Sequence, residues 1–146
     1  MEIPILRKFP VWLIIIIALL VVFLTAKILS WQYDHLEKKE FSILEEKIEE
    51  LSALGVLKDF LEARIQGNGD QAITYLTEDA MEQKNKDQFN LTDDFKNYLI
   101  LETKKLEKDK YQFSVKIYKK IDYILEKIIV TKVLEKYYID SVIVTE

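Results

Sequence analysis

The chain contains few residues that could carry out acid–base or nucleophilic chemistry. It has one histidine, His35, and no cysteine among its 146 residues. His35 lies beside a long apolar segment, outside the core expected for the rest of the chain, so a histidine-dependent catalytic triad has no base there. The lack of cysteine excludes disulfides and thiolate metal sites. Three glycines in all leave no phosphate-binding loop and no dinucleotide fingerprint.

The carboxylates form no recognisable metal-binding pattern. Two adjacent pairs, Asp93-Asp94 and Glu45-Glu46, point their side chains in different directions. Each pair is explained as a capping turn or as the solvated face of a helix. Calcium loops need oxygen ligands at alternating positions, and this spacing does not occur. We therefore expect no metal and no cofactor.

The charge balance excludes nucleic acid as a partner. The chain has 21 basic and 25 acidic residues, of which three and one lie in residues 1–30, so residues 31–146 hold 18 and 24, a net charge of −6. Nucleic acids and anionic lipid surfaces favour basic faces. The composition after residue 30 suits one small folded domain.

The strongest pattern in the sequence is an apolar run from Phe9 to Leu29, interrupted only by Pro10, Thr25 and Lys27. Its 21 residues, at ~1.5 Å each in a helix, cover roughly 30 Å, which is the thickness of the hydrocarbon core of a bilayer. We therefore predict a short tail over residues 1–8 and a transmembrane anchor over residues 9–30.

The ends of this run carry the side chains typical of a membrane interface, namely Trp12 at one end and Lys27, Trp31 and Tyr33 at the other. Aromatic rings fix the depth of a spanning helix, and a lysine stem reaches the headgroups at small cost. The alternative is a cleaved signal peptide. The run is longer than the apolar region of a signal peptide, and no small-residue cleavage site follows it, because Leu24-Thr25-Ala26 places leucine at the critical position.

The charges beside the run indicate which side of the membrane the remaining chain occupies. Arg7 and Lys8 abut the N-terminal end, which favours a cytoplasmic N-terminus. Lys38, Lys39 and Lys47 on the other side partly cancel this bias. Because the Arg-Lys pair resembles the start of a signal anchor, we expect a single-pass protein of the cell membrane with an extracytoplasmic C-terminal domain.

Residues 31–54 have the pattern of a juxtamembrane stalk helix. Phe41, Leu44, Ile48 and Leu51 follow one another at spacings of three and four, which places them on one helix face. Two heptads are too few to predict a coiled coil. The stripe is therefore a candidate surface for a partner or a second copy, and the alternative is that it packs on its own domain.

The domain of residues 55–146 begins with helical patterns. Gly67-Asn68-Gly69 supplies the left-handed backbone that ends a helix, and Asp70 is a candidate N-cap of a short helix. Thr77 caps a further turn, residues 82–90 form a polar loop, and Thr92-Asp93-Asp94 has the pattern of another helix start.

The pattern then changes from helical to alternating, which predicts consecutive strands with short connections. Their expected bounds are residues 98–106, 111–118, 121–134 and 137–145. Four such strands form an antiparallel meander. We therefore predict an α+β fold, with a transmembrane helix and a stalk helix followed by helices packed on a curved four-stranded antiparallel sheet.

Three stretches of this domain carry a family pattern. They run from Phe60-Leu61 through Gly69-Asp70 to Tyr75-Leu76, from Tyr111 to Tyr118, and from Tyr137 to Val142. Together they resemble the nuclear-transport-factor-two-like superfamily, a cystatin-like cone of helices on a strongly curved sheet, over residues 56–146. Similar segments occur in extracytoplasmic domains of bacterial membrane-anchored regulators, including anti-sigma factors. The layout also resembles inner-membrane assembly proteins of type IV secretion systems.

The cone implied by this resemblance contains a cavity between helices and sheet. Phe60, Tyr75, Phe113 and Val115 are candidate lining residues for a small ligand, and ordinary core packing is the alternative.

Some relatives of the implied fold are isomerases and dehydratases that use an Asp and a Tyr. Asp140, Tyr98, Tyr123 and Tyr138 lie on predicted strands here, but likeness of fold does not place a catalytic site. We therefore expect no enzymatic activity. The predicted function is a membrane-anchored interaction domain that assembles with another protein of the cell envelope or with itself. The alternative is a small-ligand-binding or sensing domain.

Overall fold

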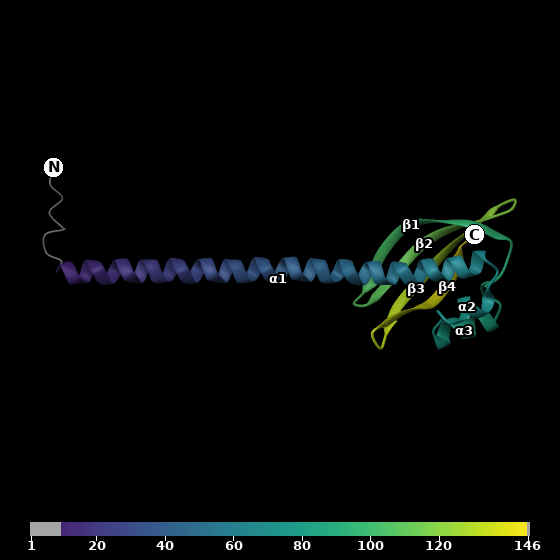
Figure 1. Cartoon of the computed structure of the whole chain (residues 1–146), viewed down its shortest axis with the longest axis horizontal. Helices are drawn as coiled ribbons and strands as arrows, with labels where there is room; N and C mark the ends of the chain where they lie inside the picture. The colour runs from purple at the N-terminus through teal and green to yellow at the C-terminus, as the bar shows by residue number, and fades with distance from the viewer. Residues whose placement is uncertain (1–9, 146) are drawn as a thin grey trace. The chain divides into compact units, whose positions relative to one another are not determined.

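A computed structural model describes residues 10–145, and it has an α+β architecture in which helices precede a sheet (Figure 1). The helices are α1 (Val11–Ile65), α2 (Gly69–Ile73) and α3 (Glu78–Asn85). The strands are β1 (Phe95–Glu107), β2 (Lys110–Lys119), β3 (Tyr123–Val133) and β4 (Lys136–Thr145). The predicted tail, residues 1–8, and Phe9 lie outside the described residues.

The predicted anchor and stalk belong to one helix, α1, which begins directly after Pro10. Its first turn is closed by the Leu13 N–H, which donates to the Pro10 carbonyl at 2.8 Å. The chain divides into two compact units, Met1–Glu45 and Glu46–Glu146, so residues 46–54 of the predicted stalk lie in the second unit. The helix ends at Ile65, and the predicted left-handed backbone follows at Gly67, where φ is +70°, an angle that glycine adopts without strain.

The two short helices confirm one predicted cap and correct another. The Thr77 hydroxyl accepts from the Ala80 N–H and caps α3 as predicted. For α2 the cap is Asn68, whose side chain accepts from the Gln71 N–H, and the predicted cap, Asp70, lies inside the first turn. Asparagine and aspartate cap equally well, so the backbone path after Gly67 decides between them.

The predicted loop over residues 82–90 is wrong in its first part, because α3 continues through Asn85. The predicted helix start at Thr92 is also wrong. There the Asp93 side chain accepts from the Asp94 N–H at 2.8 Å, and the chain turns into β1 at Phe95. Phe95 is buried in the core, and its burial commits the segment to the sheet in place of a helix.

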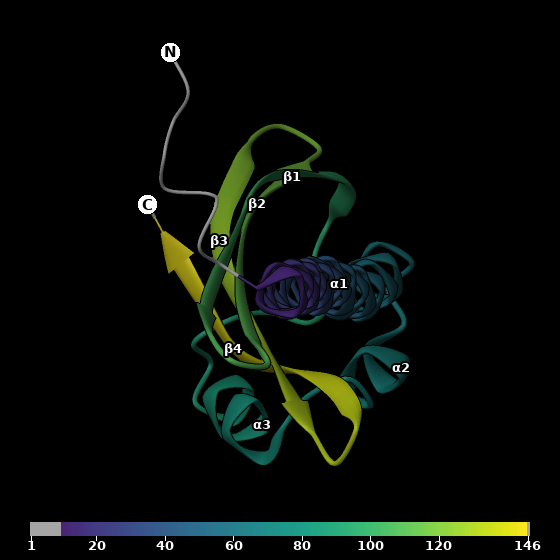
Figure 2. The same ribbon diagram turned by 90° about the vertical axis from the view of Figure 1, so that its left-hand side faces the viewer.

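The four strands form the predicted antiparallel meander in the order β1-β2-β3-β4. The first strand begins three residues earlier than predicted, and the third begins at Tyr123, after Ile121. Register shifts interrupt β1 opposite β2 at three places, and such bulges bend a strand and increase its twist. Figure 2 shows the sheet curving around the α1 axis.

The core of the second unit lies between α1 and the inner face of the sheet. Ala53, Leu57 and Phe60 of α1 are fully buried against inward-facing residues of the strands. On β2 every second side chain from Tyr111 to Ile117 is buried, as expected for a strand with one face toward the core. Within residues 10–145, α3 lies beside β4 at the edge of the sheet, and no helix lies across the outer face (Figure 2).

Candidate interaction surface

The inner face of the sheet is filled by side chains. Phe60, Phe113 and Val115, three of the predicted lining residues, are 0%, 0% and 1% exposed and belong to the hydrophobic core. Tyr75, the fourth, packs against the margin of the core and lines a shallow groove with Val56, outside it. The structure thus brings three of the four residues together as packing.

A buried charged pair joins α1 to β3. Arg64 of α1 donates two hydrogen bonds to the Glu126 carboxylate of β3, at 2.6 and 2.9 Å, and both side chains are 1% exposed. The same guanidinium donates to the Asn90 carbonyl at 2.6 Å and lies over the ring of Phe95. A bidentate pair in this setting fixes how α1 is placed against β3. Sequence reasoning missed it, because a single Arg and a single Glu 62 positions apart carry no local pattern.

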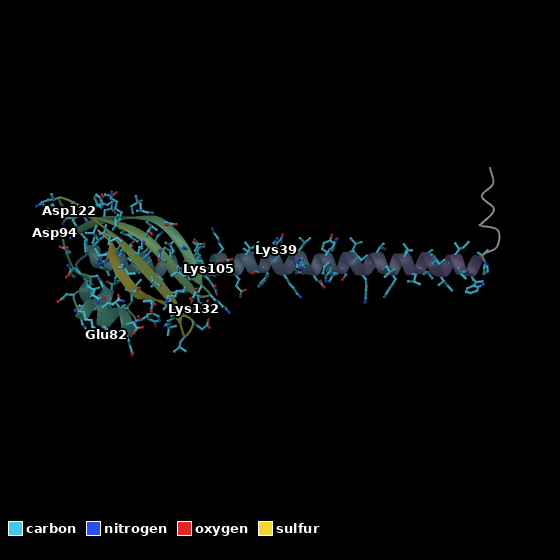
Figure 3. The ribbon with its side chains drawn as sticks, turned by 180° about the vertical axis from the view of Figure 1, so that it is seen from behind. Lys39, Glu82, Asp94, Lys105, Asp122 and Lys132 are labelled. Atoms are coloured by element: carbon cyan, nitrogen blue, oxygen red, sulfur yellow. The ribbon has the colours of Figure 1, made fainter. Side chains whose placement is uncertain are left out.

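Two ion pairs, one exposed and one partly buried, join strand ends to the start of this unit. Lys105 of β1 binds Glu46 at 2.7 Å, and Lys132 of β3 lies 3.7 Å from Glu49. Both lysines lie at the same end of the sheet (Figure 3).

Beside these pairs, the phenols of Tyr111 and Tyr137 are buried without a hydrogen-bond partner among the described residues. Burial raises the pKa of both phenols, so they stay neutral at physiological pH.

The other end of the sheet carries a charged contact of its own. Lys119 of β2 donates to Asp93 at 2.7 Å. This hydrogen bond lowers the pKa of the Asp93 carboxyl and raises the pKa of the Lys119 ammonium. Figure 3 shows Asp94 and Asp122 at this same end, far from Lys105.

A groove of about 690 Å³ lies between the start of α3 and the β3–β4 hairpin. Its lining includes Leu76, Asp79, Leu134, Tyr138 and Asp140. The groove is open to solvent, and Leu134 at the hairpin tip is 94% exposed. It lies outside the cavity between helices and sheet that the sequence predicted.

The four strand residues considered for catalysis do not share one site. Tyr138 and Asp140 line the groove, where Asp140 binds Lys110 at 3.0 Å. Tyr123 is more than half exposed on the outer face of the sheet, beneath the ammonium of Lys116. Tyr98 is on β1, and burial raises the pKa of its phenol.

Across residues 10–145 no three His, Asp or Glu side chains gather where they could hold a metal ion.

The predicted stripe on α1 is exposed along its whole length. Phe41 and Leu44 in the first unit are 70% and 61% exposed, and Ile48 and Leu51 in the second are 62% and 56% exposed. Ile48 and Leu51 lie roughly 120–180° around the helix from Ala53 and Leu57, at about 100° per residue. They do not pack on the core of their own domain.

The predicted membrane-interface residues are all exposed on α1. Trp12, Lys27, Trp31 and Tyr33 all have exposed side chains, and Trp31 stacks on His35 of the same helix. Near its N-terminus α1 contains a window long and apolar enough to cross a membrane, and none of that window is buried. An apolar window of this length is compatible with a membrane span.

The outer face of the sheet was not identified from the sequence. By strand register it carries Leu99, Leu125, Ile129 and Ile143, interspersed with lysines. The alternation on β2 separates its inner from its outer side chains, but the neighbours across the sheet follow only from the pairing.

No family model, curated protein or solved structure matches the chain, so the resemblance to the cone-shaped superfamily stays a prediction.

Proposed function

We propose that this chain is a single-pass membrane protein whose C-terminal α+β domain is a non-catalytic module for protein–protein assembly in the cell envelope. The observation that carries the proposal is the uncovered apolar window near the start of α1. A helix of this length and composition is stable where hydrocarbon replaces water around its side chains. Trp12 at one end and Trp31 at the other match the two interfaces of a bilayer.

The interaction role is supported by the contrast between the inside and the outside of the domain. Large side chains fill the space between α1 and the sheet, whereas the α1 stripe and the outer sheet face present apolar side chains to solvent. Exposed apolar surface of this kind is typical of protein–protein contact sites. An extracytoplasmic position remains part of the proposal and follows from the charges around the run.

Membrane fractionation of the full-length chain tests the anchor. We expect it to stay in the pellet after alkaline carbonate extraction and to keep its first thirty residues, as measured by intact mass. A cleaved signal peptide would leave a chain beginning after Ala26, and release by carbonate would contradict anchoring. Protease protection of a C-terminal tag in sealed cells tests the side of the membrane.

The stripe has a test of its own. Leu44→Glu together with Ile48→Glu should reduce crosslinked assemblies of the full chain, because two new charges would have to be buried in the contact. Ile121→Glu, in the turn between β2 and β3, is the matched control, because Ile121 is an exposed apolar residue outside both surfaces. Unchanged assembly would remove the stripe from the proposal.

A second candidate function is small-ligand binding in the groove beside α3. Its volume of about 690 Å³ is within the range of ligand sites, and Tyr138 and Asp140 supply polar groups at its wall. A ligand screen by thermal shift would test it with Val133→Trp as the variant, because Val133 lines the groove and is 43% exposed, so that a bulky ring there takes up groove volume without entering the core. Hits that persist in the variant bind elsewhere.

A further inference from the structure

Two uncovered faces of the second unit carry opposite charge. The first is on α1, where Ile48, Leu51, Gly55, Asp59 and Glu62 follow at spacings of three and four and so share one side of the helix. We call this set the outer stripe. It lies opposite the side that is buried against the sheet, and its first half is apolar. Its second half carries Asp59 and Glu62, both exposed, with Lys58 at its margin, so two carboxylates stand against one ammonium.

Gly55 marks a gap in the outer stripe. A Cβ atom at this position would meet nothing within 4 Å, so no contact inside the described chain requires a glycine there. In the interior of a helix, glycine is less stable than alanine by roughly 0.5–1 kcal/mol. The gap leaves room for a side chain of a neighbouring molecule, and that contact would require a residue without a Cβ atom at this position.

The second face is the outer surface of the sheet. Its rows place Leu99 beside Lys116 and Leu125, and Ile143 beside Lys127. Lys104, Lys116 and Lys127 outnumber Glu102 and Glu107 across this face, because Asp140 is already paired with Lys110. The face is therefore apolar and basic, in a domain whose overall charge is acidic.

The opposite charges of the two faces indicate which surface binds to each of them. Two outer stripes packed together would oppose carboxylates to carboxylates, and two sheet faces would oppose lysines to lysines. An outer stripe against a sheet face pairs opposite charges and buries apolar side chains from both. We propose that the outer stripe of one copy docks on the outer sheet face of the next copy in the same membrane.

Residues of α1 and β3 that would meet in this contact lie at the same height along the α1 axis. Arg64 is level with Glu126, and Glu49 is level with Lys132. Lys127 and Ile129 lie between Glu126 and Lys132 on β3, so their levels correspond to the part of α1 that holds Glu62, Asp59 and Gly55. This step rests on the proposed function, because anchors in one membrane hold neighbouring copies parallel and at equal height. Lys127 then faces Asp59 or Glu62 of the neighbour, and Ile129 faces its Gly55.

The contact is head to tail, because the two faces lie on opposite sides of the unit. α1 covers the inner face of the sheet, so the outer stripe and the outer sheet face point away from each other (Figure 2). A heterologous contact of this type continues from copy to copy, and it closes into a ring or extends as a row. The domain is therefore a self-assembling module in the plane of the membrane.

Mixed crosslinking of two tagged copies tests the contact. The natural chain has no cysteine, so Gly55→Cys in one full-length copy and Ile129→Cys in the other provide the only thiols. After coexpression, membranes are treated with a short bismaleimide. We expect a product that carries both tags, and little product from cells that express either variant alone.

Charge reversal separates a specific contact from crowding. Lys127→Glu in the Ile129→Cys copy should lower the mixed product about tenfold, and Glu62→Lys in the Gly55→Cys copy should restore it. Lys120→Glu, in the exposed turn after β2, is the matched control and should leave the yield unchanged.

Each result has a defined meaning for the two proposals. Product from either single variant alone, or no loss with Lys127→Glu, would overturn the head-to-tail contact. Retention in carbonate-washed membranes without mixed product would overturn this contact and leave the membrane-anchored domain in place. Release by carbonate would overturn both.

Discussion

Removing one partner of the buried Arg64–Glu126 pair should unfold the domain at much lower denaturant concentration. In Glu126→Leu, the guanidinium keeps only the Asn90 carbonyl at 2.6 Å and loses bonds of 2.6 and 2.9 Å to the carboxylate. Each charge-assisted bond contributes about 1.5–3 kcal/mol. The uncompensated buried charge therefore lowers the free energy of unfolding by about 3–5 kcal/mol.

For the double variant Arg64→Met with Glu126→Leu, we expect the free energy of unfolding to change little. It removes both charges at once, and apolar side chains fill the space between Phe60 and Phe95. The Asn90 carbonyl loses its donor, at a cost of about 1 kcal/mol. Replacement of a buried pair by apolar groups is often neutral or stabilising, so we expect stability within about 1 kcal/mol of the natural chain.

Urea unfolding of the full chain in detergent micelles measures both effects, with the strand signal in far-UV circular dichroism as the readout. Glu126→Gln retains a neutral acceptor and extends the series should Glu126→Leu not fold. The exposed pair of Glu82 and Lys86, 2.6 Å apart, provides the control, because Glu82→Leu should produce no resolvable change. The reasoning would be refuted if the free energy of unfolding fell by less than about 1 kcal/mol in both Glu126→Leu and Glu126→Gln. It would also be refuted if the double variant lost as much stability as the two single variants added together.

Three further predictions follow from local features. Leu134 and Glu135 both have positive φ, at 47° and 69°, in a two-residue turn, so Leu134→Asn with Glu135→Gly should raise the free energy of unfolding by about 1 kcal/mol in the same assay. Tyr137→Phe should leave stability unchanged or raise it, because the lost hydroxyl has no partner among the described residues; a clear loss would reveal a bond that the phenol makes. The pKa of the Asp93 carboxyl is lower in the folded chain than its usual value, so the ionised carboxylate stabilises the fold at pH values above the usual pKa range of aspartate. This stabilisation is lost as the pH falls through and below that range. Asp93→Asn should therefore flatten the decline in unfolding midpoint below about pH 4, and an unchanged acid profile would contradict the role of the Lys119 contact.

The sequence alone determined the order and type of most elements. Hydrophobic period is a local property, so the apolar run, the helix that ends just before Gly67, and the four alternating strands could all be predicted from neighbouring residues. The Thr77 cap was predictable for the same reason, since the hydroxyl binds an N–H three residues away. The exposed α1 stripe was visible as a spacing, although its lack of an intramolecular cover was not.

Only the tertiary structure decided how distant residues meet. Asp93 and Asp94 have the composition of a helix start, but burial of Phe95 and the contact with Lys119 commit them to the entry of β1. The pair of Arg64 and Glu126 joins residues 62 positions apart, and strand register places Lys127 beside Ile143 on the uncovered face. Local propensities differ by less than about 1 kcal/mol, so burial and charge pairing across the core decide such cases.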